Sequence, residues 1–136
     1  MSKYNTNLAS EFYVLSMLHR LGIQATLTLG NRKAVDIVVV RDGGDVITID
    51  VKGLAGITEW PIDNVETENP KQNHFLVFVS FLNRIADPGI VPEVYVIPAT
   101  SIPPLVYTIK SGRKFIGLRR LRKEAPEFKH AWSLLQ

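Results

Sequence analysis

Residues 34–52 read AVDIVVVRDGGDVITIDVK. Two runs rich in β-branched residues flank a turn of Asp and Gly, which is the pattern of a β-hairpin. Side chains alternate along a strand, so Asp50 and Lys52 share one face of the second run. The opposite face would carry the packing residues Ile47, Ile49 and Val51. This hairpin decides the fold, because it places core residues and charged residues together on adjacent strands.

The register of the hairpin decides whether two carboxylates meet. If the turn is symmetric about Gly43, Asp36 lies opposite Asp50, with Cβ atoms about 5 Å apart. A two-residue Gly43-Gly44 turn would instead pair Asp36 with Val51, and the carboxylates would converge only through a bulge. Two like charges this close are unfavourable unless a proton, a cation or a metal ion relieves them. The pair therefore either lowers stability or does chemistry.

A third carboxylate lies upstream. Residues from Asn7 to Leu21 are expected to form an amphipathic helix that ends at Gly22. At 100° per residue, Glu11 falls in the middle of the apolar stripe of this helix. A carboxylate on a buried face is costly unless it is paired, hydrogen-bonded or bound to a cation. The alternative is a glutamate at the boundary of the stripe that reaches solvent.

The remaining pattern predicts one α/β domain over residues 1–136. Residues 75–82 form a continuous apolar run, expected of a central strand covered on both faces. Residues 53–73 show no clear pattern, and a loop this long is usually functional or contains a short helix. The other expected elements are strands at 24–29, 34–40, 46–52 and 93–97, and a final helix at 126–135.

The composition fits a water-soluble protein of ordinary size. A chain of 136 residues can bury a core without disulfides, and the absence of cysteine excludes thiolate zinc sites. The N-terminus lacks the apolar segment of a signal peptide, and no apolar stretch is long enough to cross a bilayer. We therefore expect a cytoplasmic protein with no membrane partner.

The net charge of +3 is unevenly distributed. From residue 110 onward there are eight Lys or Arg against two Glu, whereas residues 41–69 hold seven acids against two bases. A basic cluster suits contacts with a nucleic-acid backbone, although a solvated edge of an amphipathic helix explains it equally well. The candidate nucleic-acid-binding residues are Arg32, Lys33, Arg119, Arg120, Arg122 and Lys123. Trp60 and Trp132 are expected as core or interface anchors rather than as stacking platforms for bases.

The charged residues of the hairpin and the helix have the chemistry of a metal site. Mg²⁺ and Mn²⁺ prefer carboxylate oxygens, and Mg²⁺ usually keeps waters that can be activated as nucleophiles. Glu11, Asp36 and Asp50 could supply such a shell. Lys52 could orient a water molecule or stabilise charge that develops on a phosphate.

These residues resemble the PD-(D/E)xK nuclease superfamily, and most closely its small Holliday-junction-resolvase-like domains. The resemblance is carried by Glu11, Gly22, Asp36 and the triplet Asp50-Val51-Lys52. It implies a restriction-endonuclease-like fold, a mixed central β-sheet flanked by helices. It also implies Glu11, Asp36 and Asp50 as metal ligands and Lys52 as the catalytic lysine. The sequence departs from the family pattern at Val35, where the proline of the motif would stand.

Two functions follow from the resemblance. The first is a Mg²⁺- or Mn²⁺-dependent endonuclease that hydrolyses phosphodiester bonds of DNA, branched or duplex, as a homodimer with two sites. The second is a catalytically inactive endonuclease-like module that binds nucleic acid or protein, because a fold does not fix a function. Convergence of Glu11, Asp36 and Asp50 discriminates between them. RNA and nucleotide substrates stay open.

Overall fold

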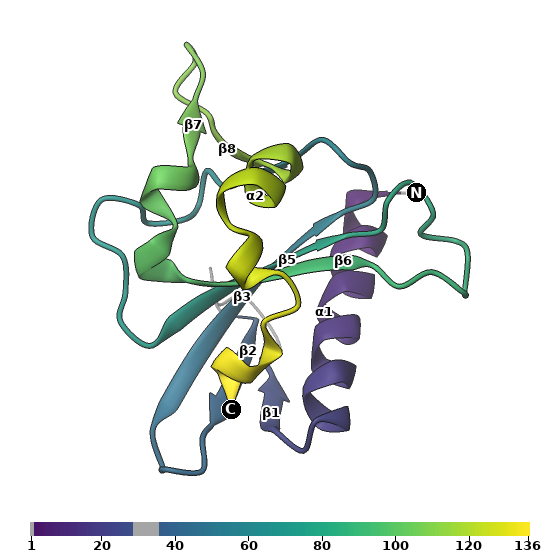
Figure 1. Cartoon of the computed structure of the whole chain (residues 1–136), viewed down its shortest axis with the longest axis vertical. Coiled ribbons are helices and arrows are strands. Elements are labelled where there is room, and N and C mark those ends of the chain that lie inside the picture. Colours follow the sequence, from purple (N-terminus) through teal and green to yellow (C-terminus); the bar gives the residue numbers. More distant parts are fainter. Residues whose placement is uncertain (1, 29–35) are drawn as a thin grey trace.

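The computed structural model describes residues 2–28 and 36–136. The helices and strands are α1 (Lys3–Arg20), β1 (Gln24–Leu27), β2 (Ile37–Val40), β3 (Val46–Leu54), β4 (Glu59–Pro61), β5 (His74–Ser80), β6 (Glu93–Pro98), β7 (Tyr107–Thr108), β8 (Lys114–Gly117) and α2 (Leu118–Glu124). Figure 1 shows β7, β8 and α2 grouped at the top of the view, whereas β1 and β2 lie near the bottom. Within the described residues, no helix is long and apolar enough to cross a membrane.

The main sheet has five strands in the order β1-β2-β3-β5-β6. Its neighbours are antiparallel except β3 and β5, which run parallel. All residues of β5 are buried, because a core cluster packs against each face of this strand. The predicted α/β class, with a mixed sheet flanked by helices, is confirmed.

The β2–β3 hairpin adopts the symmetric register. Ile37 pairs with Ile49 and Val40 with Val46, so the axis passes through Gly43. The Gly44 N–H donates to the Arg41 carbonyl at 2.9 Å, and Gly44 has a φ of +90°. This is a three-residue turn whose last residue is left-handed, a conformation that glycine adopts without a steric penalty. The register is the symmetric alternative; its ladder ends at the Ile37–Ile49 pair, and Asp36 follows just outside β2.

Helix α1 begins earlier than predicted and buries a different face. Ser2 caps its N-terminus by accepting a hydrogen bond from the Asn5 N–H. The residues that face the sheet are Thr6, Ser10, Val14 and Leu18. Small polar residues lie in this face because α1 approaches β3 at Gly53, where an added Cβ would lie 3.0 Å from the Thr6 carbonyl oxygen. The prediction of Glu11 at the centre of the buried stripe was therefore wrong, and Glu11 lies at its margin.

A second, three-stranded sheet in the order β4-β8-β7 covers the opposite face of β5 and β6. Its strand β4 comes from the stretch that showed no clear pattern in the sequence. Trp60 of β4 is 1% exposed, and its Nε1–H donates to the Val79 carbonyl at 3.2 Å. Trp132 packs against the other core cluster. Both tryptophans thus serve packing, as expected.

The predicted C-terminal helix is absent from the described residues. Two short 3-10 turns, Pro126–Phe128 and Trp132–Leu135, stand in its place. Between them Lys129 is extended and bridges to Tyr95 on β6, and His130 has a φ of +51°. Pairing of this segment with the edge of the main sheet thus replaces the helical hydrogen bonds that the sequence pattern favoured.

Candidate active site

The candidate site lies where β3 runs beyond the start of β2. Strand β2 begins at Ile37, opposite Ile49, whereas β3 continues to Leu54. Asp36 occupies the transition: its backbone N–H donates to the Ile49 carbonyl at 2.7 Å. Its Oδ2 accepts a hydrogen bond from the Val51 N–H, also at 2.7 Å. The Asp36 side chain therefore takes the place of a strand partner and is held beside Asp50.

Asp50 is 3% exposed and has few partners for its charge. The Nζ of Lys52 lies 3.4 Å from its Oδ2, which makes an ion pair. Among the residues that the structure describes, this buried Oδ2 has no hydrogen-bond partner. Burial raises the pKa of Asp50, although the charge of Lys52 opposes the shift. A buried carboxylate oxygen without a donor is costly unless a further ligand satisfies it.

The pKa of Asp36 is raised as well. Burial raises its pKa from 3.8 to about 6, and the neighbouring Asp50 charge adds to the shift while the Val51 N–H opposes it. The two carboxyl groups are close enough that each changes the pKa of the other. The pair that the sequence predicted is thus brought together, and it favours binding of a positive charge.

Glu11 approaches the pair without joining it closely. Burial raises the pKa of Glu11, and the Asp36 charge raises it further. Glu11 therefore faces the same site from α1. In residues 2–28 and 36–136, however, no three Asp, Glu or His side chains converge closely enough to hold one ion as they stand.

The carboxylates line a cavity of about 680 Å³ between α1, β3 and β4. Four acidic side chains and two basic ones face it: Glu11, Asp36, Asp50 and Glu59, with Lys3 and Lys52. The surplus of acids makes the cavity attractive to cations. Trp60 of β4 also lines the cavity and gives it a buried apolar wall.

The far wall of the cavity contains a residue that sequence reasoning missed. Asn64, which follows β4, accepts a hydrogen bond from the Lys52 Nζ at 2.9 Å. In the sequence Asn64 is one polar residue in the long segment 53–73, which also contains Glu59. Nothing in that segment singles Asn64 out. Gln72 is exposed in the turn before β5 and does not line the cavity.

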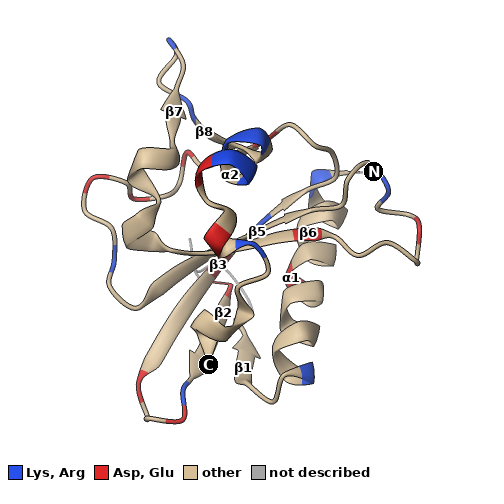
Figure 2. Cartoon of the chain, viewed as in Figure 1, with Lys and Arg blue, Asp and Glu red and all other residues tan. Residues whose placement is uncertain are grey.

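The four basic residues predicted to bind nucleic acid near the C-terminus lie outside this cavity. Arg119, Arg120, Arg122 and Lys123 gather on α2, where Figure 2 shows a blue cluster. Arg122 forms an ion pair with Glu93 at 2.8 Å, and Arg120 forms one with Glu124 at 3.3 Å. Leu118 and Leu121 of α2 are buried, so the helix is amphipathic. Nucleic-acid binding by this helix stays a prediction, and Arg32 and Lys33 lie outside the described residues.

Comparison with solved structures finds a likeness over nearly the whole chain. The bacterial homing endonuclease I-Ssp6803I superposes with a TM-score of 0.62 and 19% sequence identity, covering 98% of this chain and 93% of the other. No protein-family model matches the sequence, and neither does any curated protein. At this identity the likeness establishes that the chain shares its fold with a homing endonuclease.

Proposed function

We propose that this chain is a metal-dependent endonuclease of the PD-(D/E)xK type that hydrolyses phosphodiester bonds of DNA. The observation that carries the proposal is the buried Asp36–Asp50 pair with Lys52 beside it, in an acidic cavity. The fold that the chain shares with the homing endonuclease I-Ssp6803I supports the same reading.

The donor set fits Mg²⁺ or Mn²⁺. Asp50 offers a buried Oδ2 without a hydrogen-bond donor in the described part of the chain, and Asp36 lies beside it. A cation held by these two oxygens, with Glu11 as the third ligand, would satisfy the orphaned atom and relieve the like charges. Such an ion, when bound, supplies a Lewis acid and an activated water at the phosphate.

The side chains of the chain perform the remaining tasks. Lys52 points its ammonium into the cavity 3.4 Å from Asp50, where it can stabilise negative charge that develops on a phosphate oxygen. Asp36 is held in orientation by the Val51 N–H, so its carboxylate needs little reorganisation to bind a ligand. Cleavage of both strands of a duplex requires two such sites, which we expect a homodimer to supply.

The alternative is a catalytically inactive module on the same scaffold. The position of Glu11 favours it, because Glu11 lies at the margin of the α1 face and does not form a three-ligand cluster with the aspartates within the described residues. In this case the chain would bind nucleic acid or protein without cutting.

A cleavage assay separates the two functions. Supercoiled plasmid and a four-way DNA junction would be incubated with the protein and Mg²⁺ or Mn²⁺, and compared with Lys52→Ala. Lys110→Ala is a matched control, because Lys110 is exposed in a turn outside the cavity. We expect cleavage by the wild type and Lys110→Ala alone. Binding of either DNA without cleavage at any metal concentration would support the inactive module instead.

A further inference from the structure

The amine of Lys52 is held from two sides. Its Nζ lies 3.4 Å from Oδ2 of Asp50 and donates a hydrogen bond of 2.9 Å to Oδ1 of Asn64. The contact with Asp50 is longer than a hydrogen bond, so the amide provides the geometrically specific contact. We propose that Asn64 is a positioning residue that fixes the Lys52 ammonium inside the cavity, an inference that rests on the proposed function.

The loop that carries Asn64 is anchored on both sides. The Ile62 N–H donates to the Lys114 carbonyl at 3.0 Å, and the Lys114 N–H donates to Oδ1 of Asp63 at 2.9 Å. After Asn64, the Lys114 Nζ donates to the Val65 carbonyl at 2.9 Å. Ile62 and Val65 are buried in the core. Strand β8 therefore fixes the backbone around Asn64, and the second sheet acts as a platform for the active-site wall.

An amide suits this position for an electrostatic reason. Lysine has a flexible four-carbon stem with high rotamer entropy, so an unheld ammonium would sample many positions. An aspartate could accept the same hydrogen bond, but it would add a fifth carboxylate to a cavity that four already line. The neutral Oδ1 of Asn64 orients the ammonium without increasing the competition for a bound cation.

The first part of the test is spectroscopic and does not need activity. NMR relaxation of the Lys52 Cε methylene and its ammonium would be measured in the wild type, in Asn64→Leu and in Asn64→Asp. Leucine has a similar size and no acceptor, so we expect Lys52 to become mobile. Aspartate keeps the acceptor, so we expect Lys52 to stay ordered. Asn69→Ala, in the same exposed segment, is the control and should leave the signals unchanged.

The second part measures cleavage of the DNA that the wild type cuts. We expect Asn64→Leu to lower kcat about 10- to 100-fold through misplacement of the amine, with KM little changed. In a Lys52→Ala background the same substitution should have no further effect. Unchanged Lys52 relaxation in Asn64→Leu would overturn the inference. An inactive wild type whose Lys52 still loses order in Asn64→Leu would instead overturn the proposed function and keep the positioning contact.

Discussion

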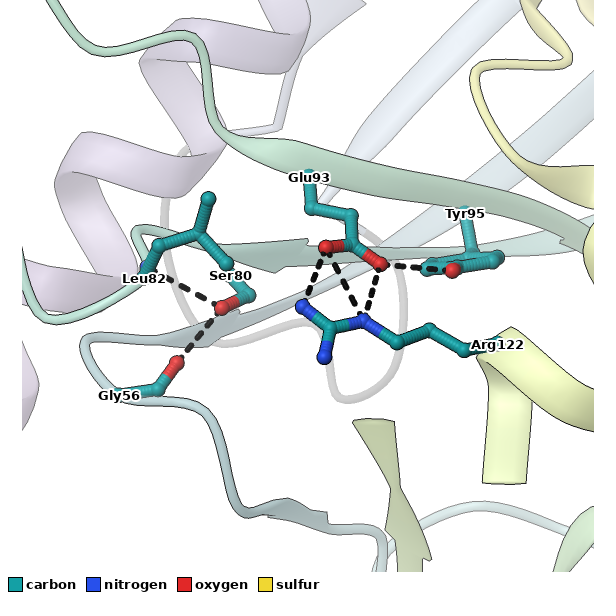
Figure 3. A network of polar contacts seen from close by, with 6 residues as sticks. All are labelled: Gly56, Ser80, Leu82, Glu93, Tyr95 and Arg122. Atoms are coloured by element: carbon teal, nitrogen blue, oxygen red, sulfur yellow. Dashed lines mark hydrogen bonds and ion pairs between the residues drawn. The ribbon is translucent and has the colours of Figure 1, made fainter. Parts of the chain in front are cut away.

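Two buried acidic regions of the same sheet behave in opposite ways. Glu93, on β6, is 7% exposed, and Asp50, on β3, is 3% exposed. Arg122 of α2 donates to both oxygens of Glu93, at 2.8 and 3.0 Å, and the Tyr95 hydroxyl donates at 2.7 Å. Figure 3 shows the side chains of Arg122 and Tyr95 converging on the Glu93 carboxylate. Asp50 has one lysine at 3.4 Å and a second acid beside it.

The difference appears in the proton affinities. The hydrogen bond from Arg122 lowers the pKa of Glu93, whereas burial raises the pKa values of Asp36 and Asp50. Burial by itself is therefore no sign of function, because a buried acid with enough donors is a structural link. A buried acid short of donors lowers stability, and proteins keep such groups where they bind or react. The Glu93 region joins α2 to the main sheet, and the Asp36–Asp50 region is the candidate active site.

Replacing each acid by its amide is the strongest way to separate the two regions. We expect Asp50→Asn to lower the rate of DNA cleavage at least 10²- to 10³-fold, because it removes the charge of one of the proposed metal ligands. Glu93→Gln should cut at a rate close to the wild type at temperatures where it is folded. Equal losses in the two variants would show that the comparison does not separate chemistry from structure.

Removing the arginine partner should affect stability most. Arg122→Ala removes the charged partner of the Glu93 carboxylate and leaves the hydrogen bond from the Tyr95 hydroxyl, so we expect a loss of about 2–3 kcal/mol in the free energy of unfolding. For a chain of this size that loss lowers Tm by about 8–12 °C. Arg119→Ala, on the exposed side of the same helix, should stay within about 0.5 kcal/mol of the wild type. Thermal unfolding followed by circular dichroism measures both, and similar Tm values would contradict the structural role of Glu93.

Removing one acid of the Asp36–Asp50 pair should raise, rather than lower, the free energy of unfolding. Asp36→Asn relieves the repulsion with Asp50, and we expect the metal-free protein to gain about 1 kcal/mol after allowance for solvent screening. The gain corresponds to a rise in Tm of about 4 °C. The same variant should lose cleavage, as expected where a strained site serves activity. A lower Tm in EDTA would mean that Asp36 is mainly a structural acceptor for the Val51 N–H.

The two regions should also respond oppositely to pH. Burial raises the pKa of Asp36 from 3.8 to about 6 in the folded protein. The folded state therefore binds this proton more tightly than the unfolded state, and stability falls as the pH rises through this window. The hydrogen bond from Arg122 lowers the pKa of Glu93 from 4.5, so the stability that Glu93 contributes is present above pH 4.5 and is lost as the pH falls. In unfolding measured from pH 3.5 to 7.5, the advantage of Asp36→Asn should grow with pH. The deficit of Arg122→Ala should shrink at the acidic end, and parallel curves would refute this assignment.

The sequence predicted the acid pair because its evidence was local. Alternation and a symmetric turn are enough to bring Asp36 near Asp50, and an unbroken apolar run is enough to identify β5. The position of Glu11 could not be predicted in this way, since α1 is rotated by the close approach of Gly53 to Ser10, a contact between residues far apart in the chain. Asn64 was missed for the same reason, because β8, fifty residues downstream, fixes its loop. The prediction of a C-terminal helix was wrong because Lys129 pairs with Tyr95 of β6, a contact that the local pattern does not show.

The central claim is that the Asp36–Asp50 pair is left short of donors so that it can hold a cation. Calorimetric titration of Mn²⁺ into the metal-free protein, into Asp50→Asn and into Glu93→Gln tests this claim without any assumption about the substrate. The account predicts binding to the wild type and to Glu93→Gln, and no binding to Asp50→Asn. Mn²⁺ binding that is equally strong in Asp50→Asn, or lost in Glu93→Gln while that variant is folded, would contradict it.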